Sequence, residues 1–152
     1  MGKWRIATQV AALACGLLLS GAASAETAQE RVNKQAVVEF YGKALNDKDF
    51  AAASKYLGDR YIQHNPTATD GPEGLKAFIQ FLRDKFPQSH SEIVQSFADG
   101  DYVILHVHSI RTPGTAGRTI VDIFKLEKGK VVEHWDAVQD IPASSANANG
   151  MF

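Results

Sequence analysis

Apolar residues recur with a helical period in the first part of the chain and with a period of two in the last part. Residues 27–45 and 70–86 carry apolar side chains at i, i+3, i+4 and i+7, which predicts two amphipathic helices. A shorter helix is expected at 49–58, where Asp49 can cap the first turn and Gly58 can end the last. Residues 60–63 read as a short strand that stops before a proline.

From Ser91 onward the period of two predicts strands at residues 92–97, 102–111, 118–127 and 130–141. Asp99-Gly100 and Lys128-Gly129-Lys130 are suited to hairpin turns between them. Three helices with one early strand, followed by antiparallel strands, predict an α+β domain whose helices cover one face of a curved sheet. Residues 143–152 are small and polar, and we expect them to form a flexible C-terminal tail.

The first 25 residues have the pattern of a cleaved signal peptide. Lys3 and Arg5 precede an apolar run at residues 6–20, which is too short to span a bilayer comfortably, and Ala23-Ser24-Ala25 fits the cleavage rule. A lipid anchor on Cys15 is the less favoured alternative. The remaining domain, residues 26–142, is therefore expected to be periplasmic or secreted.

Charge and cysteine content limit the classes of partner that the exported domain can bind and show what must stabilise it. Cys15 is the only cysteine, so the domain has no disulfide and depends on a hydrophobic core. Without Lys3 and Arg5, the 16 basic residues become 14 against 17 acidic ones, a net charge of about −3. We therefore expect no nucleic-acid partner and no membrane attachment after signal removal.

Asp122 and His108 are the residues best suited to acid–base chemistry. Asp122 lies among apolar neighbours, where its carboxylate either bonds an amide or an arginine, or acts as a general acid or base. His106 and His108 share one face of the strand at 102–111. A His–Asp pair across adjacent strands is geometrically easy, so we interpret Asp122 and His108 as a proton-transferring pair with His106 beside it.

The remaining candidates lie near strand ends and on the last strand. His64 stands before a proline, at the mouth of a cavity, where it either caps the backbone or donates to a substrate oxygen. The last strand is polar on both faces; we interpret Trp135 and Gln139 as facing inward, and His134 and Asp136 as a surface or interface pair.

A metal site is a weaker alternative to acid–base chemistry. His106 and His108 could bind a metal with His64 or Asp122, but no cysteine or compact third ligand accompanies them, so we expect no metal. The chain also lacks a glycine-rich phosphate loop, a Gly-x-Ser-x-Gly elbow and a catalytic cysteine. We therefore expect no cofactor.

Six short motifs, in order, resemble the SnoaL-like branch of the NTF2-like superfamily over residues 27–142. They are Tyr61-Ile62-Gln63-His64-Asn65-Pro66, Asp70-Gly71-Pro72-Glu73-Gly74, Gly100-Asp101-Tyr102-Val103, His106-Val107-His108, Asp122-Ile123-Phe124 and Glu133-His134-Trp135-Asp136. The resemblance implies a cone-shaped α+β barrel, in which a curved antiparallel sheet wrapped by three N-terminal helices encloses one apolar cavity. It also implies a homodimer through the outer face of the sheet.

Members of this family include polyketide cyclases, and more distant relatives include isomerases and dehydratases, so the resemblance implies a cofactor-free enzyme that removes a proton next to a carbonyl group. Asp122 and His108 would move the proton, and His64 would stabilise the enolate. The small apolar, carbonyl-bearing substrate would contact His106, Trp135, Phe124, Phe78 and Gln139. The alternative is a periplasmic binding or accessory protein that uses the same cavity without chemistry, which export favours.

Overall fold

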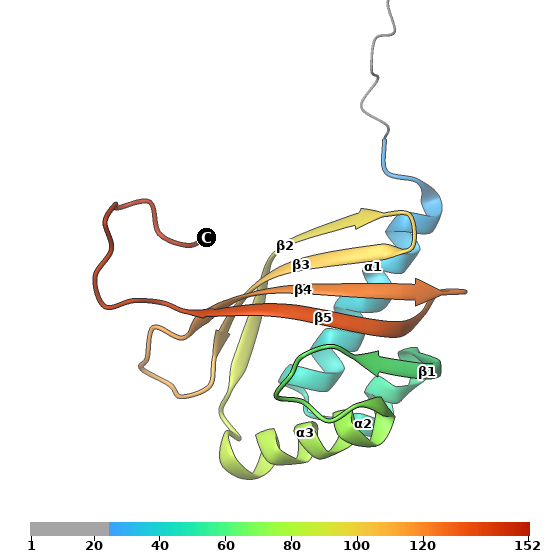
Figure 1. The fold of residues 1–152 in the computed structure, drawn as a ribbon, viewed down its shortest axis with the longest axis horizontal. Coiled ribbons are helices and arrows are strands. Elements are labelled where there is room, and N and C mark those ends of the chain that lie inside the picture. Colours follow the sequence, from blue (N-terminus) through green and yellow to red (C-terminus); the bar gives the residue numbers. More distant parts are fainter. Residues whose placement is uncertain (1–24) are drawn as a thin grey trace, which may run out of the picture.

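Two of the three helices begin at a residue whose side chain caps the first turn. The structure is a computed structural model that describes residues 25–152 (Figure 1). Its helices are α1 (Ala28–Tyr41), α2 (Phe50–Ala53) and α3 (Gly71–Lys85), with a π-helical turn at Gly42–Asn46 and a 3₁₀ turn at Ser54–Tyr56. Thr27 and Glu30 form a reciprocal capping box at α1, and the Asp49 side chain accepts a hydrogen bond from the first turn of α2.

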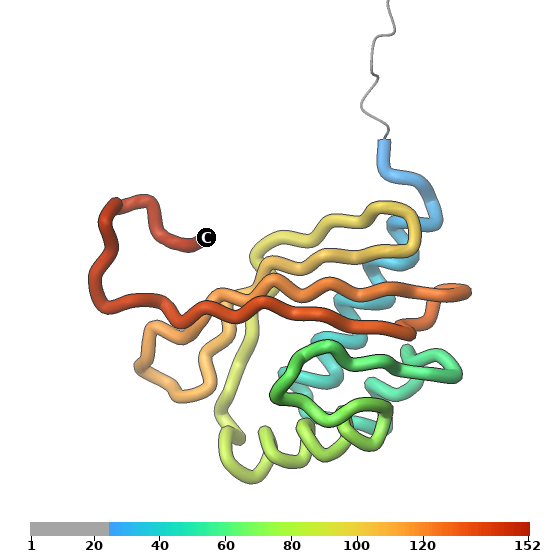
Figure 2. Tube along the Cα trace, in the orientation of Figure 1, coloured from blue at the N-terminus to red at the C-terminus, as the bar shows by residue number. Residues whose placement is uncertain are grey.

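The strands form one curved sheet in the order β1-β5-β4-β3-β2. They are β1 (Leu57–Gln63), β2 (His90–Asp99), β3 (Tyr102–Ile110), β4 (Arg118–Glu127) and β5 (Lys130–Asp140). β2 to β5 pair antiparallel as expected, whereas β1 pairs parallel with β5, so the sheet is mixed. β2 has a register shift between Ile93 and Gln95, and its trace bends toward the end of α3 (Figure 2). The expected α+β layout is thus confirmed, with a sheet that stays open between its edge strands β1 and β2.

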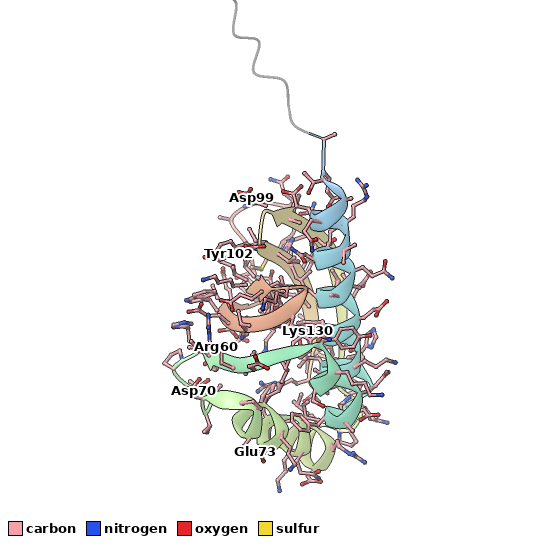
Figure 3. The ribbon with its side chains drawn as sticks, turned by 90° about the vertical axis from the view of Figure 1, so that its right-hand side faces the viewer. Arg60, Asp70, Glu73, Asp99, Tyr102 and Lys130 are labelled. Atoms are coloured by element: carbon pink, nitrogen blue, oxygen red, sulfur yellow. The ribbon has the colours of Figure 1, made fainter. Side chains whose placement is uncertain are left out.

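The core lies between the sheet and α1, which form two layers in the side view (Figure 3). On β3, Val103, Leu105 and Val107 are fully buried and define the inner face of the sheet. They belong to one cluster with Phe40 of α1 and Phe124 of β4. Because this face is covered by helices, any polar side chain on it is removed from solvent and needs a partner.

A β-bulge decides which face of β5 points inward. Near the turn, Leu126 pairs with Val131, but Lys125 pairs with Glu133, so Val132 is an extra residue. Gly58 of β1 makes room for it, since a Cβ on Gly58 would lie 2.7 Å from Val132 Cγ1. Gly58 therefore does not end the second helix as expected; that helical segment ends at Tyr56.

The two ends of the chain differ in what the structure describes. Residues 1–24, and with them almost all of the expected signal peptide, lie outside the described residues. Within residues 25–152, no helix is both long and apolar enough to span a bilayer. Residues 143–152 contain no helix or strand, and the Phe152 ring lies 4.7 Å from the His108 ring, centroid to centroid.

Candidate active site

A cavity of about 450 Å³ lies between the inner face of the sheet, α1, α3 and the loop that precedes α3. Its wall is mainly apolar near the helices, where Phe40, Leu75 and Phe78 contribute side chains. Its polar side chains come mainly from β1, β4 and β5 and from the loop after β1. Such a mostly apolar hollow with a few converging polar groups is typical of a small-molecule site.

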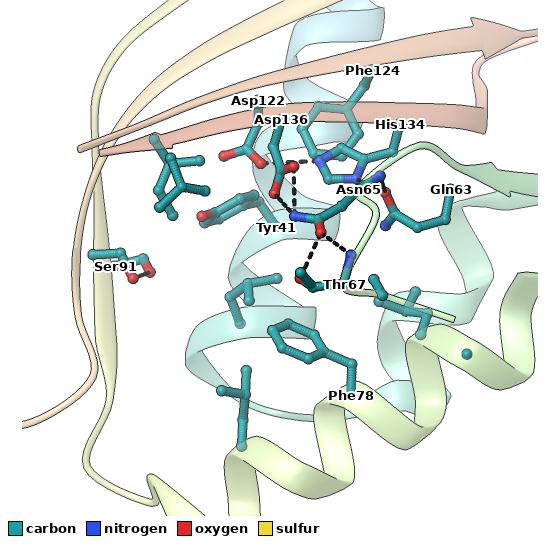
Figure 4. A pocket seen from close by; sticks show the side chains of 18 of the residues that line it. Tyr41, Gln63, Asn65, Thr67, Phe78, Ser91, Asp122, Phe124, His134 and Asp136 are labelled. Carbon is teal, nitrogen blue, oxygen red and sulfur yellow. Dashed lines mark hydrogen bonds and ion pairs between the residues drawn. The ribbon is translucent and has the colours of Figure 1, made fainter. Parts of the chain in front are cut away.

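Asp122 and His134 form a buried pair in the cavity wall (Figure 4). Asp122 pairs with Leu105 in the sheet register, which places it on the inner face. Its Oδ1 lies 3.0 Å from Nε2 of His134, and both side chains are over nine-tenths buried. The His134 ring also stacks on Phe124, with ring centroids 4.6 Å apart. Packing on that ring holds the imidazole edge-on to the carboxyl group.

The hydrogen bonds of Gln63 determine which nitrogen of His134 carries a proton. Gln63 Oε1 accepts from the backbone N–H of Asn65 at 2.9 Å, and that N–H can only donate. The same Oε1 lies 3.0 Å from Nδ1 of His134, so Nδ1 must be the donor in that contact. Nε2 is then left to face Asp122, either as a lone pair or as an N–H group.

It follows that one proton lies between Asp122 and His134 when the pair is neutral overall. Either a protonated Asp122 donates to Nε2, or an imidazolium donates from Nε2 to the carboxylate. Asp122 Oδ2 is buried and has no hydrogen-bond partner among residues 25–152. Burial raises the pKa of Asp122, and the hydrogen bond and charge of His134 oppose that rise. The proton can therefore stand on either partner of the hydrogen bond between Oδ1 and Nε2.

Asp136 lies beside this pair, and its side chain is held by the Asn65 amide. The Asn65 amide nitrogen donates to both of its oxygens, at 2.7 and 2.8 Å. The orientation of that amide is set because Asn65 Oδ1 accepts from the backbone N–H of Thr67 at 2.8 Å (Figure 4). The Asp136 charge raises the pKa of Asp122 further, since two nearby carboxylates repel.

Two buried tyrosines complete the polar side of the cavity. Burial raises the pKa of Tyr41 well above its ordinary value, and the charge of Asp122 raises it further. Burial is also the main cause of the raised pKa of Tyr61, which accepts a hydrogen bond from Gln63 Nε2 at 3.2 Å. Both phenols therefore stay protonated. Tyr41 lines the cavity and can donate a hydrogen bond to a bound ligand.

Asp122, His134 and Asp136 could also hold a metal ion. One ligand atom from each lies within 4.8 Å of the others, the one such group found among the described residues. An ion there would replace the proton between Asp122 and His134, because it needs the Nε2 lone pair. The metal set considered from the sequence, His106 and His108 with Asp122, is not assembled, because the two histidines lie on the opposite face of the sheet.

Of the residues expected to bind or react with a substrate, Asp122, Phe124 and Phe78 line the cavity. His106 and His108 do not, because they alternate with the buried Val103, Leu105 and Val107. Their ring nitrogens bond Thr119 Oγ1 and the Ala116 carbonyl oxygen on the outer side. The expected pair of Asp122 with His108 is therefore wrong in its geometry, and His134 takes the place beside Asp122.

The expected inward placement of Trp135 and Gln139 is also wrong. The bulge at Val132 turns His134 and Asp136 inward and Trp135 and Gln139 outward. His64 is exposed; its ring stacks on Trp135 at 4.6 Å and Nε2 bonds Glu133 at 2.8 Å. His64, Trp135 and Gln139 thus lie outside the cavity.

Sequence reasoning missed the polar groups that support the pair. Gln63 and Asn65 were read only as a strand end, although two amides next to a proline-fixed turn could have indicated partners for a buried charge. Tyr41 belongs to the apolar stripe of the helix predicted at residues 27–45, and its hydroxyl gives no separate signal. His134 and Asp136 were recognised as polar but placed on the wrong face.

Comparisons with known proteins agree on one family. The sequence model of the SnoaL-like domain matches residues 37–134. TsrD from Streptomyces laurentii is 22% identical, with a TM-score of 0.60 over 71% of this chain and 89% of that one. No curated protein matches the chain.

Two further solved structures have the same fold. One is from Bacillus cereus and is proposed to be a polyketide cyclase; it is 22% identical, with a TM-score of 0.61 over 70% of this chain and 74% of that one. The other is a SnoaL-like protein of unknown function from Burkholderia thailandensis; it is 18% identical, with a TM-score of 0.61 over 72% of this chain and 96% of that one. At these identities the likeness concerns the fold alone.

Proposed function

The chain belongs to the SnoaL-like domain family, and we propose that it is a cofactor-free enzyme that moves a proton next to a carbonyl group. Aldol condensation, isomerisation and dehydration all begin with this step. The proposal rests mainly on one observation: the Asp122 carboxyl group bonds His134 through Oδ1, while its buried Oδ2 has no partner. A carboxylate in that position is a base whose conjugate acid is stabilised by its surroundings.

The proposed step conserves protons. In the form with an imidazolium at His134, Asp122 Oδ2 removes a proton from the carbon next to the substrate carbonyl, and the electron pair of that C–H bond moves into an enolate. Asp122 is then a neutral acid, and it returns the proton to another atom of the same substrate. His134 keeps its bond to Oδ1 throughout, and Gln63 keeps the imidazole in place.

Tyr41 is the proposed donor to the enolate oxygen. Its raised pKa keeps the hydroxyl neutral, so it can donate without losing its proton at neutral pH. A fixed donor in a site without bulk water stabilises a developing oxyanion more than water does. This role replaces the one expected for His64, whose side chain is exposed and paired with Glu133.

A direct test is deuterium uptake by 2-tetralone, an apolar ketone with acidic protons next to its carbonyl group. We expect the protein in D₂O to accelerate uptake at that carbon above the rate in buffer alone, because Asp122 removes the proton, exchanges it for a deuteron of the solvent, and returns that deuteron to the carbon. NMR follows the loss of the proton signal. If neither 2-tetralone nor a ligand recovered from the native protein is altered, the enzyme proposal fails.

A second candidate function is that of a binding or accessory protein outside the cytoplasm. The observation that favours it is the signal-like sequence at residues 1–25, because polyketide cyclisation is a cytoplasmic reaction. Native mass spectrometry of protein from its own host would identify the bound ligand. A ligand that is recovered unchanged after incubation favours binding over catalysis.

We propose in addition that the protein is exported and that mature chains begin at Glu26. The proposal is supported by the basic start, the short apolar run and the Ala23-Ser24-Ala25 site in the sequence. N-terminal sequencing of the protein from its host tests it directly, and an intact Met1 would contradict it.

A homodimer is proposed through the outer face of the sheet. Phe97, Ile104, Ile123 and Trp135 pair in register across four strands and form an apolar row there. The Phe97 side chain is 55% exposed. Covering such a row would remove apolar area from water. Light scattering after size-exclusion chromatography distinguishes a dimer from the monomer that would contradict this proposal.

A further inference from the structure

The inner face of the sheet carries two polar rows separated by an apolar one. Asp122 and Asp136 pair in the first row. Ile120 and Val138 pair in the second. In the third row Ser91 pairs with Ser109, Ser109 with Arg118, and Arg118 with Asp140. Arg118 precedes Asp122 by four residues on the same face of β4, so their Cα atoms are roughly 13 Å apart.

The third row forms one end of the same cavity, and this end is basic. Arg111 and Arg118 both line it. The Arg111 guanidinium lies over the rings of Phe78 and Phe86, at 5.9 and 5.6 Å from their centroids, which fixes its position without neutralising it. Within residues 25–152, Arg111 has no ion-pair partner within 4.0 Å and no hydrogen bond to another side chain.

The other polar groups at this end leave the positive charge uncompensated. Arg118 is 3.7 Å from Asp140, whose side chain is 84% exposed, so water screens that pair. Ser89 Oγ is buried and has no partner among the described residues. Two guanidinium groups and an unpaired hydroxyl therefore face one end of a largely apolar cavity with a single, exposed carboxylate nearby.

We propose that the cavity end at Arg111 and Arg118 binds the carboxylate of an elongated apolar ligand whose other end reaches Asp122. The fork of N–H groups on arginine matches the two oxygens of a carboxylate, and Ser89 can donate to the same group. The apolar row between the polar rows contacts the middle of the ligand. This proposal rests on the proposed function in one respect: the end of the ligand that lies at Asp122 is taken to be the end that reacts.

Two fluorescent probes that differ in one anionic group test this selectivity. They are 8-anilinonaphthalene-1-sulfonate and N-phenyl-1-naphthylamine, which is the same molecule without the sulfonate. We expect the wild-type protein to bind the anionic probe about tenfold more tightly, as expected for a charge-assisted hydrogen bond. Arg111→Met keeps the stacking on Phe78 and Phe86, and we expect it to bring the two dissociation constants within about twofold of each other, because only the anionic probe loses affinity.

Control variants separate this result from a general effect on the cavity or on surface charge. Arg118→Gln should reduce the preference for the anionic probe in the same way, whereas Arg83→Gln, which removes an exposed arginine from the outer side of α3, should leave it unchanged. Equal affinities for both probes in the wild-type protein would overturn the proposal. So would an unchanged preference, or an equal loss for both probes, in the variants of Arg111 and Arg118.

The same titration distinguishes failure of this inference from failure of the proposed function. Asp122→Asn should keep the preference for the anionic probe, because Asp122 is roughly 13 Å along the strand from Arg118. A preserved preference in a protein that exchanges no protons would leave the carboxylate site standing and remove the enzyme proposal. Proton exchange without any preference for the anionic probe would remove the carboxylate site and leave the enzyme proposal standing.

Discussion

Asp122→Asn should lower the rate of deuterium uptake by 2-tetralone by roughly 10²–10⁴-fold, the usual contribution of a positioned acid or base. The amide has the shape of the carboxyl group, so the fold and the affinity for the ketone should change little. Its nitrogen can donate to Nε2 of His134 and keep that contact. The amide cannot accept a proton from carbon. The substitution should therefore lower the rate of deuterium uptake without weakening the binding of the ketone.

A matched control is Asp99→Asn, which makes the same chemical change at an exposed position in the β2–β3 hairpin. Its exchange rate should equal that of the wild-type protein. Thermal unfolding of both variants should show a similar midpoint. An unchanged rate in Asp122→Asn would remove Asp122 from the mechanism.

Insertion of an alanine between Val132 and Glu133 should abolish the folded cavity. With Leu126 still paired with Val131 and the bulge kept at Val132, the inserted residue takes the place of Glu133 opposite Lys125, and each later residue of β5 moves by one position. A slip of one residue moves every later side chain of β5 to the other face. Glu133 and Trp135 would then face the core, and His134 and Asp136 would leave it. Burying the Glu133 charge without a partner costs several kcal/mol, a large part of the roughly 5–15 kcal/mol that stabilises a domain.

Val132→Ala separates the register from the side chain. It leaves the bulge in place and should cost only roughly 1–3 kcal/mol, because it removes two buried methyl groups. Circular dichroism during thermal unfolding compares the two variants. An insertion variant that unfolds cooperatively near the wild-type midpoint and still exchanges protons would show that the register after the bulge does not set the site.

The elements of the fold were predictable because each has a local signal. The helical period of apolar residues over 27–45 predicted α1, and the period of two after Ser91 predicted the antiparallel strands. Where local signals conflict, tertiary contacts decided. Asp70 stands at the N-cap position of α3, but its Oδ1 accepts from the backbone N–H of Gln63 instead and so fastens the loop to β1. The parallel pairing of β1 with β5 had no local signal either.

The site was predictable only as far as Asp122. A single aspartate between apolar residues on a regular strand indicates a buried carboxyl group, and the structure places it there. Its partner was not predictable, because an uninterrupted hairpin would place Trp135 opposite Asp122, and the bulge at Val132 places Asp136 there instead. On β3, the face that carries His106 and His108 was predicted to be the inner one. The opposite face carries the apolar side chains of Val103, Leu105 and Val107, and it is the buried one.

The most direct test of the site is to locate the proton between Asp122 and His134. Protein labelled with ¹⁵N at histidine and ¹³C at aspartate carboxyl groups can be studied by NMR, with Asp122→Asn to assign the signals. We predict that Nδ1 of His134 carries a proton, because Gln63 accepts from it. We also predict that a second proton lies between Nε2 of His134 and the Asp122 carboxyl group. An Nδ1 without a proton, or no proton between Nε2 and that carboxyl group, would contradict the shared proton and the chemistry inferred from it.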